Sequence, residues 1–220
     1  MKHLRLFFAF CFGCFGFSAL AQDSTGLKGE PYHESPTDTK KATYLLKDWY
    51  SGSIRMSDNQ FYDGIQLRYD LNRDEIEYRK DSTLFRISKG VKEFTIPSGI
   101  DLYIFRSGFP SVEGLTSNSF YRIMYDGKTK LLKRYKSQIQ QEKAAATRTM
   151  EPDAKLYIYK DDTVTPVKLS DPNSFLKLLS DERNKMQYVI KEEGLEFGGD
   201  DDLAKLLEEY DSYKAGRGGN

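Results

Sequence analysis

The chain of 220 residues carries 33 basic and 33 acidic side chains, with 39% hydrophobic residues. This length holds one large domain or two small ones, and the composition is that of an ordinary globular protein. The two charge signs are interspersed along the chain. That distribution argues against nucleic acid as a partner, because nucleic-acid binding draws on clustered Lys and Arg side chains.

Residues 1–21 have the pattern of a secretory signal peptide. Lys2 and Arg5 precede an apolar run over 6–17, and an Ala-Leu-Ala cleavage site ends at Ala21, so we expect the mature chain to begin at Gln22. The run is shorter than the roughly 20 residues that span a membrane. We therefore expect an exported protein, periplasmic or secreted, with no transmembrane segment in the mature chain.

Cleavage at this site would limit the chemistry open to the mature protein. It removes both cysteines, Cys11 and Cys14, and leaves His33 as the only histidine. Without Lys2 and Arg5, 31 of the 33 basic residues remain against 33 acidic ones. The mature chain then lacks the parts for a Cys/His or Ser/His/Asp nucleophile and for a histidine-based zinc site. We expect no cofactor.

A long β-rich region follows a polar lead. Residues 22–43 have hardly an apolar side chain and predict a flexible N-terminal segment. Residues 44–169 alternate apolar and polar side chains between recurring turn signals, which predicts an antiparallel β-meander, either a bent sheet or a sandwich. Residues 102–105 are apolar on both faces and predict a strand covered on two sides. Residues 107–118 predict a long loop, of a length typical of functional or mobile loops.

Over 170–214 the apolar period changes to three and four residues, which predicts three helices. The whole is then an α+β fold, a meander followed by three C-terminal helices that pack on it in the same domain. Residues 215–220 predict a frayed tail. We expect the helices to supply the second cover of 102–105, through the apolar stripes that include Phe175, Leu179, Leu203 and Leu207.

One acidic segment partly matches a calcium-binding loop. Asp70, Asn72 and Asp74 have the spacing of its first ligands, but Glu75 stands where the sharp bend requires glycine. The flanking segments predict strands, and these residue types are common in β-turns. We therefore expect a turn and no metal. The acidic residues 200–202 suit the positive end of the third helix in the same way.

Two glutamates are the only candidates for catalysis. Glu75 and Glu77 lie on one side of a predicted strand, as paired carboxylates do in glycosidases. Cross-strand pairing with Arg68 on a wet sheet face explains them without catalysis, and we favour that interpretation. A basic run over 128–136 also has two interpretations. It is either an anion site or the solvated side of a strand, and we favour the strand.

Aromatic residues are the candidates for binding. Fifteen tyrosines accompany one tryptophan, and exposed aromatic rings on strands can stack on sugars or contact proteins. The candidate binding residues are Trp49, Tyr50, Tyr62 and Tyr103.

Several local motifs resemble uncharacterised exported proteins of Bacteroidota. They are the signal peptide, the Gly-x-Ile strand openings at Gly52 and Gly64, the Tyr-Asp pair at 69–70, and the Glu-Glu-Tyr-Asp-Ser-Tyr ending of the last helix. The resemblance implies a Gram-negative envelope location and a β-then-α layout. It also implies O-glycosylation of Asp-Ser and Asp-Thr sites, which here are at Ser82 and Thr163.

These observations favour an exported, non-enzymatic cell-envelope protein that binds a protein or a glycan. The alternative is a small carboxylate-based hydrolase, similar to a glycosidase, that uses Glu75 and Glu77.

Overall fold

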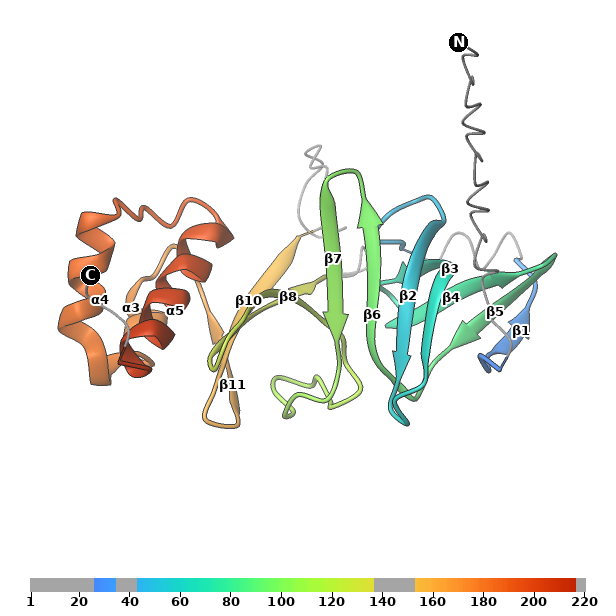
Figure 1. The fold of residues 1–220 in the computed structure, drawn as a ribbon, viewed down its shortest axis with the longest axis horizontal. Coiled ribbons are helices and arrows are strands. Elements are labelled where there is room, and N and C mark those ends of the chain that lie inside the picture. Colours follow the sequence, from blue (N-terminus) through green and yellow to red (C-terminus); the bar gives the residue numbers. More distant parts are fainter. Residues whose placement is uncertain (1–25, 35–42, 137–152, 217–220) are drawn as a thin grey trace, which may run out of the picture.

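The computed structural model describes residues 26–34, 43–136 and 153–216. Within these ranges the chain forms eleven strands and a C-terminal group of helices (Figure 1). The strands are β1 (Glu30–Tyr32), β2 (Tyr50–Met56), β3 (Phe61–Asp70), β4 (Glu75–Lys80), β5 (Thr83–Ile87), β6 (Val91–Ser98), β7 (Asp101–Arg106), β8 (Tyr121–Asp126), β9 (Lys130–Tyr135), β10 (Ala154–Lys160) and β11 (Thr163–Val167).

The strands form a single antiparallel sheet in the order β1-β5-β4-β3-β2-β6-β7-β8-β9-β10-β11. Two meanders compose it, β2 to β5 and β6 to β11, and they join where β6 pairs with β2. The predicted antiparallel meander with helices packed on it is confirmed. Of the two architectures expected, the single sheet corresponds to the bent one.

The alternation of residues along β3 places one set of side chains in the core. Ile65, Leu67 and Tyr69 are buried, because successive strand side chains point to opposite faces. The Tyr69 ring centroid lies 5.2 Å from that of Phe94 and 5.1 Å from that of Phe105. Aromatic rings from three strands therefore fill the centre of this half of the sheet.

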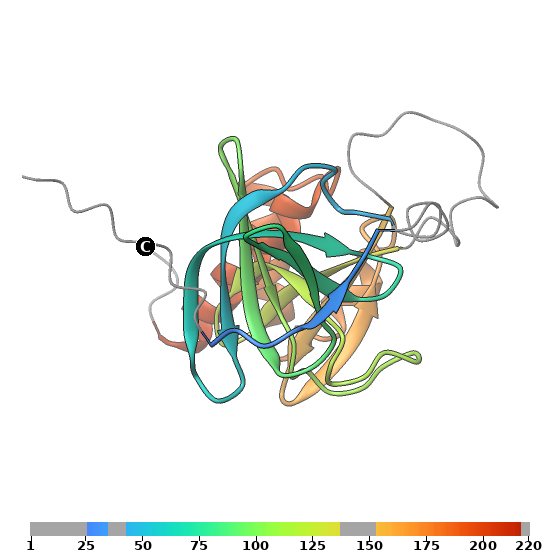
Figure 2. The same cartoon turned by 90° about the vertical axis from the view of Figure 1, so that its right-hand side faces the viewer.

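The sheet curls until β3 approaches β9, although β2, β6, β7 and β8 lie between them in the strand order (Figure 2). The Arg134 guanidinium of β9 donates from Nη1 to Tyr69 Oη at 2.9 Å and to Phe120 O at 2.7 Å. It also forms an ion pair with Asp74 Oδ1, in the β3–β4 turn, at 2.7 Å. The contact ties the two meanders together across the inside of the curl.

Helices cover one face of the second meander (Figure 1). They are α3 (Asn173–Leu176), a short 3-10 turn η1 (Ser180–Glu182), α4 (Arg183–Glu192) and α5 (Asp200–Lys214). Leu203, Leu206 and Leu207 of α5 have no exposed surface, and they share a core with Leu131 of β9 and Ile158 of β10. The helices thus belong to the same packed domain as these strands.

Among the described helices, none combines the length and the apolar character needed to cross a membrane.

The expected two-sided cover of residues 102–105 is wrong. Only Phe105 is buried, whereas the Leu102 side chain is 54% exposed and Ile100, at the hairpin tip, is fully exposed. The reason is the pairing of β7 with β8, which includes only Phe105 and Arg106. The outer end of the β6–β7 hairpin therefore extends past β8. The helices do not cover it, because they pack over β8 to β11 instead.

The expected flexible lead over 22–43 is also wrong for residues 26–34, the larger of its described parts. Strand β1 pairs with β5, and Leu27 is buried. Tyr78 Oη donates to the Leu27 carbonyl at 3.0 Å. Few apolar residues are needed here, because the segment is held mainly by backbone pairing and by polar side chains such as Tyr32.

We expect Leu206→Ala to lower the free energy of unfolding by about 2 to 5 kcal/mol, because the truncation leaves a cavity in a fully buried site. The matched control is Tyr188→Ala on α4, whose side chain is 59% exposed. Urea unfolding monitored by circular dichroism measures both variants. Equal stability of the two would contradict docking of α5 on the sheet.

Two buried tyrosines give a second test of the core. Tyr69 Oη has Asp74 and Arg134 as partners, whereas Tyr121 Oη has no hydrogen-bond partner among the described residues. We expect Tyr69→Phe to cost about 1 to 3 kcal/mol, and Tyr121→Phe to be neutral or stabilising, because an unpaired buried hydroxyl is itself unfavourable. Thermal unfolding of the two variants, measured side by side, gives the comparison; a larger cost at Tyr121 would contradict it.

Candidate functional site

Glu77 of β4 is the centre of a buried polar cluster. Its side chain has no exposed surface. Oε2 accepts hydrogen bonds from Tyr32 Oη at 2.6 Å, Tyr44 Oη at 3.0 Å and Arg68 Nε at 2.8 Å, and Oε1 accepts from Arg86 Nε at 2.8 Å. Burial opposes ionisation, but the hydrogen bonds from Tyr32, Arg86 and Arg68 outweigh it and lower the pKa of Glu77.

This geometry decides between the two interpretations of the glutamate pair. The expected pairing of Glu77 with Arg68 is confirmed, but the expected wet face is wrong at Glu77, because β1 and Tyr44 cover it. Glu75 is partly buried, and burial raises its pKa. A catalytic carboxylate must reach a substrate. The enclosed Glu77 carboxylate therefore does not fit the glycosidase hypothesis.

The four aromatic binding candidates lie in different environments. Trp49 lies beside the Glu77 cluster, where the Arg68 and Arg79 guanidinium carbons lie 4.3 Å and 4.7 Å from its ring centroid. Tyr62 is buried and donates to Gln60. The remaining two are half-buried against the core: Tyr50, and Tyr103, which lies under Arg122.

Residues 70–74 form a turn in which the two carboxylates have separate partners. Asp70, which is fully buried, accepts from the Asn72 amide at 2.9 Å and from Arg73 Nη1 at 2.6 Å. Asp74 instead contacts Tyr69 and Arg134. In the described part of the chain, no group of three His, Cys, Asp or Glu side chains is placed to hold a metal ion.

The acidic residues 200–202 lie in the first turn of α5, as predicted for a helix N-terminus. Asp202 Oδ2 accepts from the Phe197 amide at 2.7 Å, in the segment that precedes the helix. Asp200 forms an ion pair with Lys133 of β9 at 2.8 Å. These two carboxylates thus connect the N-terminus of α5 to the preceding segment and to β9.

The basic run over 128–136 divides between the two faces of β9. Lys130 forms an ion pair with Asp126 at 2.6 Å, and Lys133 forms one with Asp200. The Arg134 side chain is only 15% exposed. The interpretation as one solvated strand side is therefore wrong for Arg134, because the curl of the sheet brings the β3–β4 turn over it.

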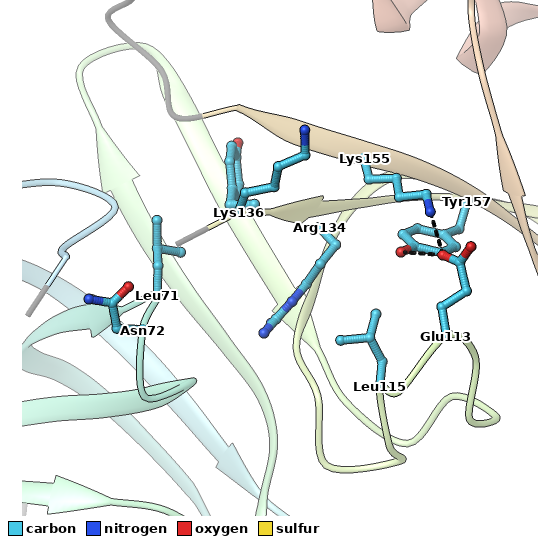
Figure 3. Close-up of a pocket in the computed structure, with 9 residues that line it drawn as sticks. Leu71, Asn72, Glu113, Leu115, Arg134, Lys136, Lys155 and Tyr157 are labelled. Carbon is cyan, nitrogen blue, oxygen red and sulfur yellow. Dashed lines mark hydrogen bonds and ion pairs between the residues drawn. The ribbon is translucent and has the colours of Figure 1, made fainter. Parts of the chain in front are cut away.

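A cleft of about 550 Å³ opens beside Arg134 (Figure 3). Its walls come from the ends of β9 and β10, from the β3–β4 turn and from the loop over 107–118. We call it the β9–β10 cleft; its lining residues are Leu71, Asn72, Glu113, Leu115, Arg134, Tyr135, Lys136, Lys155 and Tyr157. Both meanders contribute to it, so the cleft exists because the sheet is curled.

The charged residues that line this cleft are mainly basic. Arg134, Lys136 and Lys155 are its cations, and Glu113 is its one acidic residue. Lys155 Nζ and Tyr157 Oη both donate to Glu113 Oε2, the latter at 3.2 Å (Figure 3). The hydrogen bond from Lys155 lowers the pKa of Glu113. Burial, together with the Glu113 charge, raises the pKa of Tyr157, which stays a hydrogen-bond donor.

None of the candidate binding residues from the sequence lines this cleft, although Asn72 was among the candidate metal ligands. Glu113 lies 42 residues before Lys155 and 44 before Tyr157, and the two segments show no shared motif. One indication of this cleft was present in the sequence, the length of the loop over 107–118, because loops of that length are often functional.

The two candidate O-glycosylation residues lie at hairpin tips. Ser82 is in the β4–β5 turn and Thr163 begins β11 after the β10 turn, and both are exposed. Their modification stays a prediction.

Stability should depend on pH through Glu77. Folding lowers the pKa of Glu77 from its usual value of 4.5. Its contribution to the free energy of unfolding is therefore complete at neutral pH. That contribution is lost as the pH falls from about 4.5 through the lower pKa of the folded protein.

We expect Glu77→Gln to cost about 3 to 5 kcal/mol at pH 7, since it removes the buried carboxylate that Arg68 and Arg86 share. Among the described residues, Arg68 is then left with only the half-exposed Glu34 as an ion-pair partner. Between pH 5 and 3 the stability of Glu77→Gln should change less than that of the natural protein.

Urea unfolding at a series of pH values measures this difference. Glu192→Gln, an exposed change on α4, is the matched control and should keep the natural pH profile. A Glu77→Gln profile parallel to that of the natural protein would contradict the lowered pKa.

Comparisons with protein-family models, with curated proteins and with solved structures find no match for this chain. The resemblance to exported proteins of Bacteroidota therefore stays a prediction. Function has to be inferred from the geometry of the site itself.

Proposed function

We propose that this chain is an exported, non-enzymatic cell-envelope protein that binds a glycan in the β9–β10 cleft. The observation that carries the proposal is the cleft itself, whose volume of about 550 Å³ lies in the range of small-molecule sites. Hydrogen-bonding residues from four segments line it: the β3–β4 turn, the loop over 107–118, β9 and β10. The pattern of residues 1–21 supports export.

The shape and lining of the cleft favour a glycan over a protein. A protein partner usually needs about 800 Å² of surface on each side, whereas a cleft suits a ligand that enters it. Glycans present many hydroxyl groups, which need donors and acceptors at fixed positions. The lining supplies an amide, a phenol, three cations and a carboxylate, through Asn72, Tyr157 and the charged side chains already described.

The same lining favours binding without cleavage. Glycosidases use, in most families, two carboxyl groups on either side of the scissile bond. Glu113 is the one carboxylate that lines the cleft, and the Glu75–Glu77 pair lies on β4, where Glu77 is enclosed. A bound glycan would therefore meet a single carboxylate, which is already held by Lys155.

We expect the mature protein to retain particular oligosaccharides on a glycan array and to bind them in calorimetric titration. Lys155→Met should weaken binding of the best oligosaccharide at least about tenfold, or about 1.4 kcal/mol, because it removes a charged donor from the cleft. Lys205→Met is the matched control, since Lys205 is a similarly exposed lysine paired with Glu193 on the helices.

Two results would contradict the proposal. An array without any specific signal would argue against a glycan ligand. Equal loss of affinity in Lys155→Met and Lys205→Met would place the binding site outside the β9–β10 cleft.

A further inference from the structure

We infer that Lys155 and Tyr157 form a carboxylate subsite in the β9–β10 cleft, and that the glycan bound there is an acidic one. The inference rests on the proposed function and names its ligand class. In this structure the subsite is occupied from within the chain, because Glu113 Oε2 accepts from both Lys155 Nζ and Tyr157 Oη (Figure 3).

The two donors are fixed by the sheet. Lys155 and Tyr157 are two residues apart on β10, so their side chains project from the same face. β10 is an interior strand of the sheet, paired with β9 on one side and with β11 on the other. The Tyr157 ring also packs edge-on against Tyr121, with centroids 5.5 Å apart. The Tyr157 hydroxyl is therefore in place whether or not Glu113 is there, and the Lys155 side chain starts from the same face beside it.

Glu113, in contrast, comes from the loop over 107–118. It sits at the tip of a tight turn, with φ of +49°, and Gly114 follows with φ of +83°. The turn is closed by hydrogen bonds between the backbones of Val112 and Leu115. The carboxylate thus reaches the subsite from a turn outside the sheet, as the carboxylate of a separate ligand would.

The contact between Glu113 and Lys155 is open to solvent. Their side chains are 42% and 39% exposed, and ion pairs at such positions contribute little to stability. Displacement of Glu113 by another carboxylate therefore costs little. The incoming group regains both hydrogen bonds, which are strong because the acceptor is charged.

The charge of the lining selects for an acid. Once Glu113 has moved out, no other carboxylate of the lining is left to pair with Lys155, while Arg134 keeps its own partner, Asp74. A neutral sugar would leave Lys155 without an anionic partner. A sugar acid replaces Glu113 with the same kind of group, so the ligand class that fits best is a glycan with carboxylate substituents, such as one built from uronic acids.

The test uses an α-1,4-linked galacturonate trisaccharide and its methyl ester, which has the same backbone but no free carboxylate. Each is titrated by calorimetry into the mature protein, into Glu113→Gln and into Glu193→Gln. The last is the matched control, because Glu193 makes a similarly exposed pair with Lys205. Thermal unfolding confirms that all three proteins are folded.

We expect the natural protein to bind the acid at least about tenfold more tightly than the ester. Glu113→Gln should bind the acid about five- to tenfold more tightly still. This is the factor expected if Glu113 occupies the subsite roughly 80 to 90% of the time in the natural protein, so that only the remaining fraction is open to the ligand. Its affinity for the ester should change much less, and Glu193→Gln should behave as the natural protein does.

The outcomes separate this inference from the proposed function. Equal affinity for acid and ester, or weaker binding of the acid by Glu113→Gln, would overturn the carboxylate subsite while glycan binding stands. Failure of the natural protein and of Glu113→Gln to bind either trisaccharide, together with an empty glycan array, would overturn glycan binding itself.

Discussion

The polar contacts across the inside of the curled sheet centre on one side chain, Arg134. From β9 its guanidinium reaches Tyr69 on β3, Asp74 in the following turn and the Phe120 carbonyl. A cation this poorly exposed has to be compensated, because an unpaired buried charge is very costly. The three acceptors converge only when the two meanders face each other. The same geometry brings the β3–β4 turn to the wall of the β9–β10 cleft, so fold and candidate site have a common origin.

Local patterns in the sequence were enough for most of the elements, though not for β1, and for one contact. Alternation over 44–169 predicted the meander and the apolar stripes predicted the helices. The hairpin between β3 and β4 placed Arg68 opposite Glu77. Contacts between distant segments could not be predicted in this way. Tyr32 is 45 residues from Glu77, and its role follows only from the pairing of β1 with β5, which no local pattern specifies.

The candidate site was harder to predict than the fold for the same reason. Glu113, Arg134 and Lys155 each have an ordinary local explanation, as a loop residue or as a charge on a strand. They line one cleft because β10 pairs with β9 and because the loop over 107–118 folds back beside them. The wrong prediction for residues 102–105 has the same cause. Apolar residues on both faces of a strand indicate that it can be covered on two sides, but they do not show whether the end of the strand lies within the sheet or extends past it.

The strand order also determines what the sheet presents to other chains. Its two outermost strands are β1 and β11, and each contains a proline, Pro31 and Pro166. Proline has no amide hydrogen, so an edge strand that contains it offers an incomplete template for further pairing. β1 is also only three residues long. An eleven-stranded open sheet could grow by edge-to-edge association into aggregates, and these two short edges work against that at both ends.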